Sequence, residues 1–192
     1  MTIKQSKLIA FNKPYGVISQ FSPDVNHPSL AEFISDKEVY PAGRLDTDSE
    51  GLLLLTNDGL LQAKLSSPKF AKRKTYIVQV DGIATQWHID QLESGVNIGD
   101  NYITKPAQAK LIEEPLWLWS RTPPVRYRKN IPTSWIELTI TEGKNRQVRK
   151  MTSKLGLPTL RLIRVAIGEY NLLQLGLQPG TVCTIIVNNS QS

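Results

Sequence analysis

Cysteine and histidine are scarce in this chain of 192 residues, which has one cysteine and two histidines. Cys183 alone cannot form an internal disulfide, and together with His27 and His88 it supplies too few soft ligands for a zinc or iron–sulfur site. The sequence therefore excludes a disulfide-stapled fold and predicts no metal site. We assign no chemical role to His88, on a predicted helix, or to Cys183, in a predicted strand.

Long hydrophobic runs are missing as well. The longest aliphatic run, residues 52–55, is far shorter than the roughly 20 apolar residues that span a bilayer, and residues 1–7 lack the apolar stretch of a signal peptide. These absences predict a cytoplasmic protein without a membrane segment. With 40% hydrophobic and 21% charged residues the composition is ordinary for a globular protein, and the length predicts one domain over residues 1–192, built from two lobes that share a sheet.

Positive charge is in excess and is unevenly distributed. The chain has 23 Lys and Arg residues against 17 Asp and Glu residues, which gives a net charge of +6. Fifteen of the basic residues lie in three windows without any acidic residue, 69–74, 121–129 and 144–164, and the rest of the chain carries a net charge of −9. Clustered basic residues in an otherwise acidic chain are typical of proteins that bind a polyanion, because each neutralised phosphate releases counterions.

A solvated surface or a membrane-binding surface accounts less well for this charge pattern. A solvated charged surface would spread the basic residues more evenly along the chain. A protein that binds membrane phosphates would be expected to contain a basic amphipathic helix with an aromatic apolar face, and the sequence shows none. We therefore favour a nucleic acid as the partner.

Hydrophobic periodicity predicts the order of strands and helices. Strands are expected at residues 8–11, 52–56, 74–80, 135–140, 160–167 and 181–187, and helices at 30–34, 59–66, 85–94 and 146–155. The proline-rich region between residues 105 and 132 is expected to hold strand fragments and an ordered loop. Hairpin-like strand pairs mixed with isolated helices indicate an α+β fold with a largely antiparallel or mixed sheet.

For two of these helices, the sequence also predicts the capping residues and the apolar stripe that faces the core. The helix at 59–66 is expected to be capped by residues 57–59 and to turn three leucines inward: Leu60, Leu61 and Leu65. Asn145 is expected to cap the helix at 146–155, whose inward stripe comprises Val148, Met151 and Leu155. Arg149 on that helix points away from the stripe.

The polar segment 44–50 holds the densest set of candidate catalytic carboxylates: Asp46, Asp48 and Glu50, with Arg44 beside them. A paired-carboxylate glycosidase or a magnesium-dependent nuclease would both use such a cluster, the first for acid and nucleophile roles and the second to hold a hard cation. The same residue types are also ordinary turn formers. Asp46 is the best single candidate, because the adjoining apolar strand would desolvate it, and a desolvated carboxylate needs a cationic partner such as Arg149.

Tyr76 lies two residues after the basic run 72–74, on a strand whose alternation predicts one buried face. A tyrosine in this position suits stacking on an extruded nucleobase while lysines hold the phosphate backbone. It fits a core position on the same face as Val78 equally well, and both interpretations can hold together. Trp117 and Trp119 are interpreted as core-filling residues.

Five motifs in a fixed order carry a resemblance to a known family. The segment GRLDTDSEGLLLLTNDG at 43–59 resembles the catalytic motif of the RsuA-type pseudouridine synthases, and FNKPYG at 11–16, KTYIV at 74–78, EGKNRQVRKM at 142–151 and LRLIR at 160–164 match further family elements. Segments 117–119 and 131–135 are most similar to the branch of this family that modifies the large ribosomal subunit. Only ten residues precede Phe11, so we expect no N-terminal S4-type RNA-binding domain, and RNA recognition is expected to rest on the catalytic domain.

The resemblance implies a fold and a set of site residues. The fold is an α+β catalytic domain with a central, largely antiparallel or mixed sheet, flanking helices, two subdomains and a cleft. Asp46 matches the essential catalytic aspartate, Tyr76 the tyrosine that packs against the target base, and Arg149 the basic residue that pairs with the aspartate. Arg44 matches a position that can fill the space left by the extruded nucleotide, whereas Asp48 and Glu50 have no catalytic counterpart. The other expected RNA contacts are Lys72, Arg73, Lys74, Lys144, Arg146 and Lys150.

The implied reaction is the isomerisation of uridine to pseudouridine, which breaks the N1–C1′ bond, turns the uracil and rejoins it through C5. Nothing is consumed or released, so we expect no cofactor and no metal. The motif is compatible with attack of the Asp46 carboxylate on C1′, with its addition to C6, and with removal of a proton from C2′. The implied substrate is a specific uridine of 23S ribosomal RNA, free or in pre-ribosomal particles, and we expect a monomeric enzyme with a role in ribosome biogenesis.

Two further classes of function stay open at this point. An RNA-binding assembly factor could keep the fold without the catalysis, and Asp46→Asn would then leave its biological effect intact; the complete set of Asp46, Tyr76 and Arg149 argues against this class. A magnesium-dependent nuclease built on Asp46, Asp48 and Glu50 would cleave strands in a chelator-sensitive manner.

Overall fold

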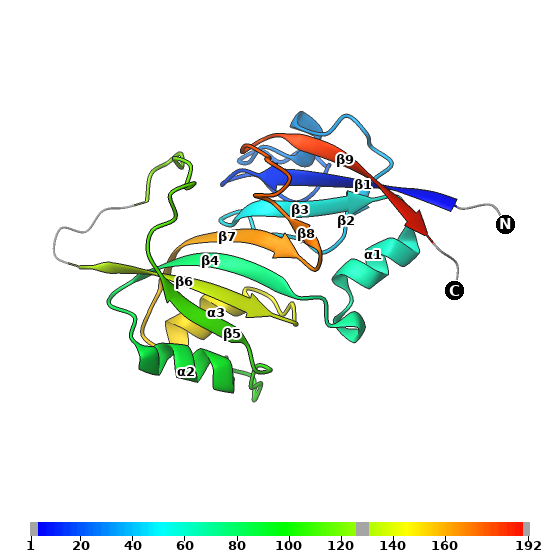
Figure 1. Cartoon of the computed structure of the whole chain (residues 1–192). Helices are drawn as coiled ribbons and strands as arrows, with labels where there is room; N and C mark the ends of the chain where they lie inside the picture. Colours follow the sequence, from blue (N-terminus) through cyan, green and yellow to red (C-terminus); the bar gives the residue numbers. More distant parts are fainter. Residues whose placement is uncertain (1–3, 126–130, 190–192) are drawn as a thin grey trace. The chain divides into compact units, whose positions relative to one another are not determined.

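The structure, a computed structural model, describes residues 4–125 and 131–189. Within these ranges it contains nine β-strands, three α-helices and two 3₁₀ helices, which confirms the α+β class (Figure 1). The chain divides into two compact units: unit 1 comprises Met1–Lys72 and Ile167–Ser192, and unit 2 comprises Arg73–Ala166. No helix in the described ranges is long and apolar enough to cross a membrane.

Unit 1 is built around strand β1 (Lys4–Lys13). This strand lies between β3 (Glu50–Thr56) and β9 (Val182–Asn189) and pairs antiparallel with both (Figure 1). All seven residues of β3 are buried, as its run of four leucines predicts. The short strand β2 (Tyr40–Pro41) pairs antiparallel with β3. The other short elements of the unit are η1 (Leu30–Glu32), α1 (Gly59–Ser66), η2 (Pro68–Phe70) and β8 (Tyr170–Asn171).

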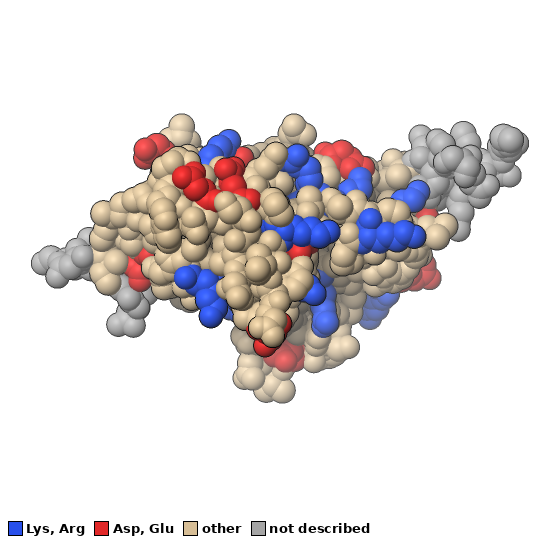
Figure 2. Space-filling model, turned by 90° about the horizontal axis from the view of Figure 1, so that it is seen from below, with Lys and Arg blue, Asp and Glu red and all other residues tan. Residues whose placement is uncertain are grey.

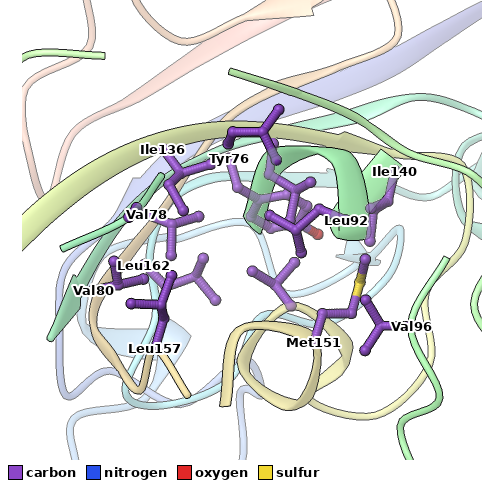
Figure 3. Close-up of a cluster of buried hydrophobic side chains, with 14 residues drawn as sticks. Tyr76, Val78, Val80, Leu92, Val96, Ile136, Ile140, Met151, Leu157 and Leu162 are labelled. Atoms are coloured by element: carbon purple, nitrogen blue, oxygen red, sulfur yellow. The ribbon is translucent and has the colours of Figure 1, made fainter. Parts of the chain in front are cut away.

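Unit 2 contains a sheet with two helices on one face. Its strands run in the order β5 (Gln108–Ile112), β6 (Thr133–Ile140), β4 (Lys74–Asp81) and β7 (Thr159–Ile167), and β6 is antiparallel to both of its neighbours. Helices α2 (Gln86–Ser94) and α3 (Gln147–Lys154) contribute Leu92 and Met151 to a buried cluster that also includes Val78 and Ile136 from the sheet (Figure 3). The strands and helices of this unit therefore share one apolar core.

The opposite face of this sheet is buried in part. Ile77 and Trp135 lie there in a second buried cluster, against which the loop residues Trp117 and Trp119 pack. Both tryptophans are half-buried, so their interpretation as core-filling residues is confirmed in part. The alternation predicted for the strand at 74–80 is largely confirmed, because Tyr76, Val78 and Val80 are buried whereas Thr75 and Gln79 are half-buried. Ile77 departs from it: it lies on the second face and is buried, in the cluster against which this distant loop packs.

All six predicted strands and all four predicted helical segments are present, with three differences of detail. The segment 30–34 forms only a 3₁₀ turn, which begins in a capping box at Ser29. Helix α3 begins after Arg146, which has a left-handed backbone with φ of 50°, and not after Asn145. Leu60 is 77% exposed, because residues 61 and 65 share the buried face of α1 and successive helical residues lie about 100° apart.

Candidate active site

Asp46 lies in unit 1, on a loop that hydrogen bonds hold on both sides of it. The Ser19 hydroxyl donates to the carbonyl oxygen of Leu45 at 2.6 Å and accepts from the N–H of the same residue at 3.2 Å. The N–H of Ser49 donates to the Asp46 carbonyl oxygen at 3.0 Å and closes a turn. The backbone around the carboxylate is therefore fixed from the Leu45 side and from the Ser49 side.

A buried lysine makes a second clamp on this loop. Lys13, at the end of β1, is fully buried, and its ammonium donates to the carbonyl oxygens of Val17 at 2.7 Å, Pro14 at 3.0 Å and Thr47 at 3.5 Å. The Thr47 carbonyl oxygen also accepts from the N–H of Gly16 at 2.8 Å, in a turn where φ of Gly16 is +84°, a conformation that favours glycine. The FNKPYG and GRLDTD motifs thus form one hydrogen-bonded assembly.

The acidic residues of this loop have different environments. Asp46 and Asp48 are half-buried, whereas Glu50 is only 1% exposed, as the first residue of β3. Across the described ranges, no three His, Cys, Asp or Glu side chains are grouped so that they could hold a metal ion. The geometry of Asp46, Asp48 and Glu50 therefore gives no support to the magnesium-dependent nuclease. Arg44, on the same loop, is exposed.

Tyr76 and Arg149 both belong to unit 2. Tyr76 is 7% exposed, and Figure 3 shows its side chain within the cluster of buried apolar residues, close to the labelled Ile136 and Leu92. No hydrogen bond joins its hydroxyl to another residue that the structure describes. Its position as a core residue is confirmed, and its contact with a base stays a prediction.

Arg149 projects from α3 toward the start of β7. It is half-buried, and its Nη1 lies 3.5 Å from the carbonyl oxygen of Thr159. The Thr152 hydroxyl links the same elements, because it donates to the Arg149 carbonyl oxygen at 3.3 Å and lies 2.7 Å from the Thr159 hydroxyl. The helix is thereby tied to the strand at the position that carries the arginine. The predicted pairing of Arg149 with Asp46 joins residues of the two units and stays a prediction.

The basic residues expected to contact RNA differ in exposure. Arg73, Lys144 and Arg146 are exposed, and Lys72 and Lys150 are half-buried. Figure 2 shows several groups of Lys and Arg side chains on the drawn face, with acidic side chains between them. Lys72 Nζ lies 2.9 Å from Glu169 Oε2, and Arg73 donates to the side-chain carbonyl of Gln108. Arg126, Arg128 and Lys129 of the basic window 121–129 lie outside the described residues.

Lys74 is unlike the other basic residues of the predicted site. It is only 7% exposed, and burial, together with the neighbouring charge of Arg164, lowers the pKa of its ammonium below the ordinary value. This environment favours an internal role for Lys74 over direct contact with a phosphate at the surface. The motif position alone did not reveal the burial, because lysine is rarely a core residue.

The comparisons with known proteins agree with these motifs. The sequence model of the family described as RNA pseudouridylate synthase matches residues 7–154. "Ribosomal large subunit pseudouridine synthase E" of Vibrio vulnificus (strain CMCP6) is 52% identical over 180 residues, which cover 94% of this chain and 75% of the relative. The protein of the same name from Xanthomonas axonopodis pv. citri (strain 306) is 53% identical over 167 residues, 86% of this chain and 87% of the relative.

A solved structure extends the agreement to three dimensions. The crystal structure of a pseudouridylate synthase superimposes with a TM-score of 0.74 at 26% sequence identity and covers 96% of this chain and 71% of that chain. The resemblance of the motifs to the RsuA-type pseudouridine synthases and to their large-subunit branch is thus confirmed, as is the α+β pseudouridine synthase fold. The chain belongs to the RNA pseudouridylate synthase family and is a pseudouridine synthase, an isomerase.

Proposed function

We propose that the chain converts one specific uridine of 23S ribosomal RNA to pseudouridine, with Asp46 as the catalytic residue and without a cofactor. The observation that supports it best is the clamped loop, in which Lys13 and Ser19 fix the backbone on either side of a half-buried aspartate. The names of the relatives that are more than half identical to the chain support the large ribosomal subunit as the source of the substrate. Such a substrate implies work in the cytoplasm, and we propose a monomer.

The reaction makes two physical demands on these residues. Extrusion of the uridine costs a few kcal/mol, which stacking on Tyr76 and phosphate contacts of the basic residues would offset. The carboxylate of Asp46 has to be held in one orientation, because a displacement of about 1 Å can cost a factor of about 100 in rate. An ion pair with Arg149 would orient the carboxylate in a site from which the base excludes water.

The test is the mapping of pseudouridine in unmodified 23S RNA. We would incubate the RNA with the protein in the presence of chelator and detect pseudouridine by carbodiimide adduct formation and primer extension. We expect one new stop in a stem-loop, lost with Asp46→Asn and kept with Asp48→Asn, which makes the same chemical change two residues away on the same loop.

Three different results would contradict the proposal. Strand cleavage that chelator abolishes would indicate the nuclease. Modification that survives Asp46→Asn would remove the assigned catalytic residue. Tight binding without any modification, on free RNA and on pre-ribosomal particles, would indicate the assembly factor.

A further inference from the structure

A buried carboxylate in unit 2 has no role in the site described so far. Glu142 follows β6 in the EGKNRQ segment and is only 5% exposed. Its Oε1 accepts from the Tyr102 hydroxyl, and its Oε2 accepts from the backbone N–H of Lys105 at 2.9 Å and from the side-chain amide of Gln147 at 2.7 Å. Three donors from two distant segments of the chain therefore meet on one carboxylate.

These contacts keep the carboxylate charged. Burial alone would raise the pKa of Glu142, but the hydrogen bonds from Tyr102, the Lys105 backbone and Gln147, together with the charge of Lys105, outweigh burial and lower the pKa below its ordinary value. A buried charge is costly unless hydrogen bonds compensate for the lost water, so the carboxylate and its three donors hold one another in place.

Two of the residues that donate to Glu142, Gln147 and Tyr102, also contact Lys144. Gln147, whose amide N–H group donates to Glu142, accepts at its Oε1 from the backbone N–H of Lys144 at 3.0 Å. Tyr102, whose hydroxyl donates to Glu142, carries the Lys144 ammonium over its ring, with Nζ 4.3 Å from the ring centroid. The backbone and the side chain of Lys144 are thus each held by a residue that Glu142 holds.

Lys144 is available to an anion from this position. It is exposed, and it makes no ion pair with any residue that the structure describes. An ammonium over an aromatic face keeps donors free, whereas one paired with a carboxylate would have to give up that pair before it could bind a phosphate. Lys105, tied to the same carboxylate by its backbone, is exposed as well. A lysine held in place also loses less side-chain entropy on binding.

We propose that Glu142 is a positioning residue that, through Tyr102 and Gln147, holds Lys144 in place as a contact to an RNA phosphate. The inference rests on the proposed function, since it presumes that the polyanion is the RNA substrate. Glu142 itself touches no RNA in this arrangement. It acts on binding, through Lys144.

The test is a double-mutant cycle on RNA affinity. The dissociation constant of an RNA fragment that carries the modified uridine is measured for the wild type, Lys144→Ala, Glu142→Ala and the double variant. Single-turnover conversion at saturating RNA is measured alongside. Each single variant is expected to weaken binding several-fold and to reduce the slope of log K against log salt by about 0.7 to 0.9, the value for one phosphate contact. The double variant is expected to bind as weakly as Lys144→Ala alone, and for each single variant the loss of affinity is expected to exceed any change in the rate of conversion.

Three further variants separate positioning from a general loss of structure. In Glu142→Gln, the amide oxygen can accept from Lys105 and Gln147 while the amide nitrogen donates to the Tyr102 hydroxyl, so binding is expected to stay close to that of the wild type. Tyr102→Leu removes the ring beneath the ammonium and is expected to weaken binding as Lys144→Ala does; it decides the question if Glu142→Ala fails to fold. Lys110→Ala is the matched control, because Lys110 is an exposed lysine of the same unit that pairs with Glu137 at 3.1 Å.

The failures are distinguishable. If the wild type forms no pseudouridine, the proposed function is wrong. If the wild type is active but Lys144→Ala binds like the wild type, only the inference about Glu142 is overturned. The inference is also overturned if Glu142→Ala weakens RNA binding by the same factor in the wild type and in Lys144→Ala. Equal factors would mean that Glu142 and Lys144 act independently on affinity.

Discussion

At the scale of single residues, Lys13 is a buried charged side chain that stabilises the local structure. Its ammonium is fully buried and reaches carbonyl oxygens on two segments, the 14–17 turn and the Asp46 loop. Carbonyl oxygens left unpaired in a buried site are costly, so the lysine and the loop depend on each other. The sequence signalled this residue only as part of a family motif.

Lys13→Met tests this dependence. It keeps the length and the apolar stem but removes the donors, so we expect a loss of about 1–3 kcal/mol in the free energy of unfolding and a large loss of activity, because the Asp46 loop is released. Urea denaturation and the pseudouridine assay measure the two effects.

The matched control is Lys7→Met, on the same strand. Lys7 is 42% exposed and pairs with Asp36 at 2.5 Å, and such surface pairs contribute about 0–1 kcal/mol. Equal losses of stability from the two variants would show that the buried ammonium contributes nothing specific.

At the scale of elements, helix α1 contains one leucine that packs in the protein interior and another that lies at the surface. Leu65 is 1% exposed and Leu60 is 77% exposed, although both are leucines of the same eight-residue helix. Leu65→Ala is expected to lower the free energy of unfolding by about 2–5 kcal/mol, since it removes buried methyl groups and leaves a cavity. Leu60→Ala is expected to change it by less than about 0.5 kcal/mol. Thermal or urea unfolding of the pair measures the difference, and similar values would contradict the assigned helix face.

The elements themselves were largely predictable from the sequence, because they depend on local pattern. Alternation predicted β4 and β6, the run of leucines predicted β3, and the apolar stripe of α3 placed Val148 and Met151 in the core, as found. The errors concern packing that is not local. Ile77, on the second face of β4, is buried in a cluster against which a loop about forty residues away in the chain packs, and no period within the strand reveals this.

The motifs mark candidate site residues whose roles stay predictions, whereas residues defined by long-range contacts could not be found from the sequence. Asp46, Tyr76 and Arg149 were singled out by motif position. Glu142 was quoted as part of a motif but given no role, because its three donors come from residues 102, 105 and 147, and sequence spacing does not show that these meet. The burial of Lys74 was missed for the same reason.

At the scale of the whole molecule, the proposed catalytic set is drawn from both units. Asp46 belongs to unit 1, and Tyr76 and Arg149 belong to unit 2. The family match, over residues 7–154, includes all three residues and parts of both units. The expected RNA contacts are divided in the same way, because Arg44 and Lys72 belong to unit 1 and the others to unit 2. Neither unit alone carries the proposed activity, so binding and catalysis should be measured on the full chain.

Electrostatic binding by the full chain predicts a strong dependence on salt. If Arg44, Lys72, Arg73, Lys144, Arg146 and Lys150 each neutralise one phosphate, log K should fall with log salt with a slope of about −4 to −5, and affinity should drop by about 300- to 1,000-fold between 50 and 200 mM salt. Lys74 is left out of this sum because it is buried. Fluorescence anisotropy with a labelled RNA fragment across a KCl series measures the slope, with Lys110→Ala as the control that leaves it unchanged. A slope shallower than about −1 would contradict a phosphate-binding surface, because one contact alone contributes about that much.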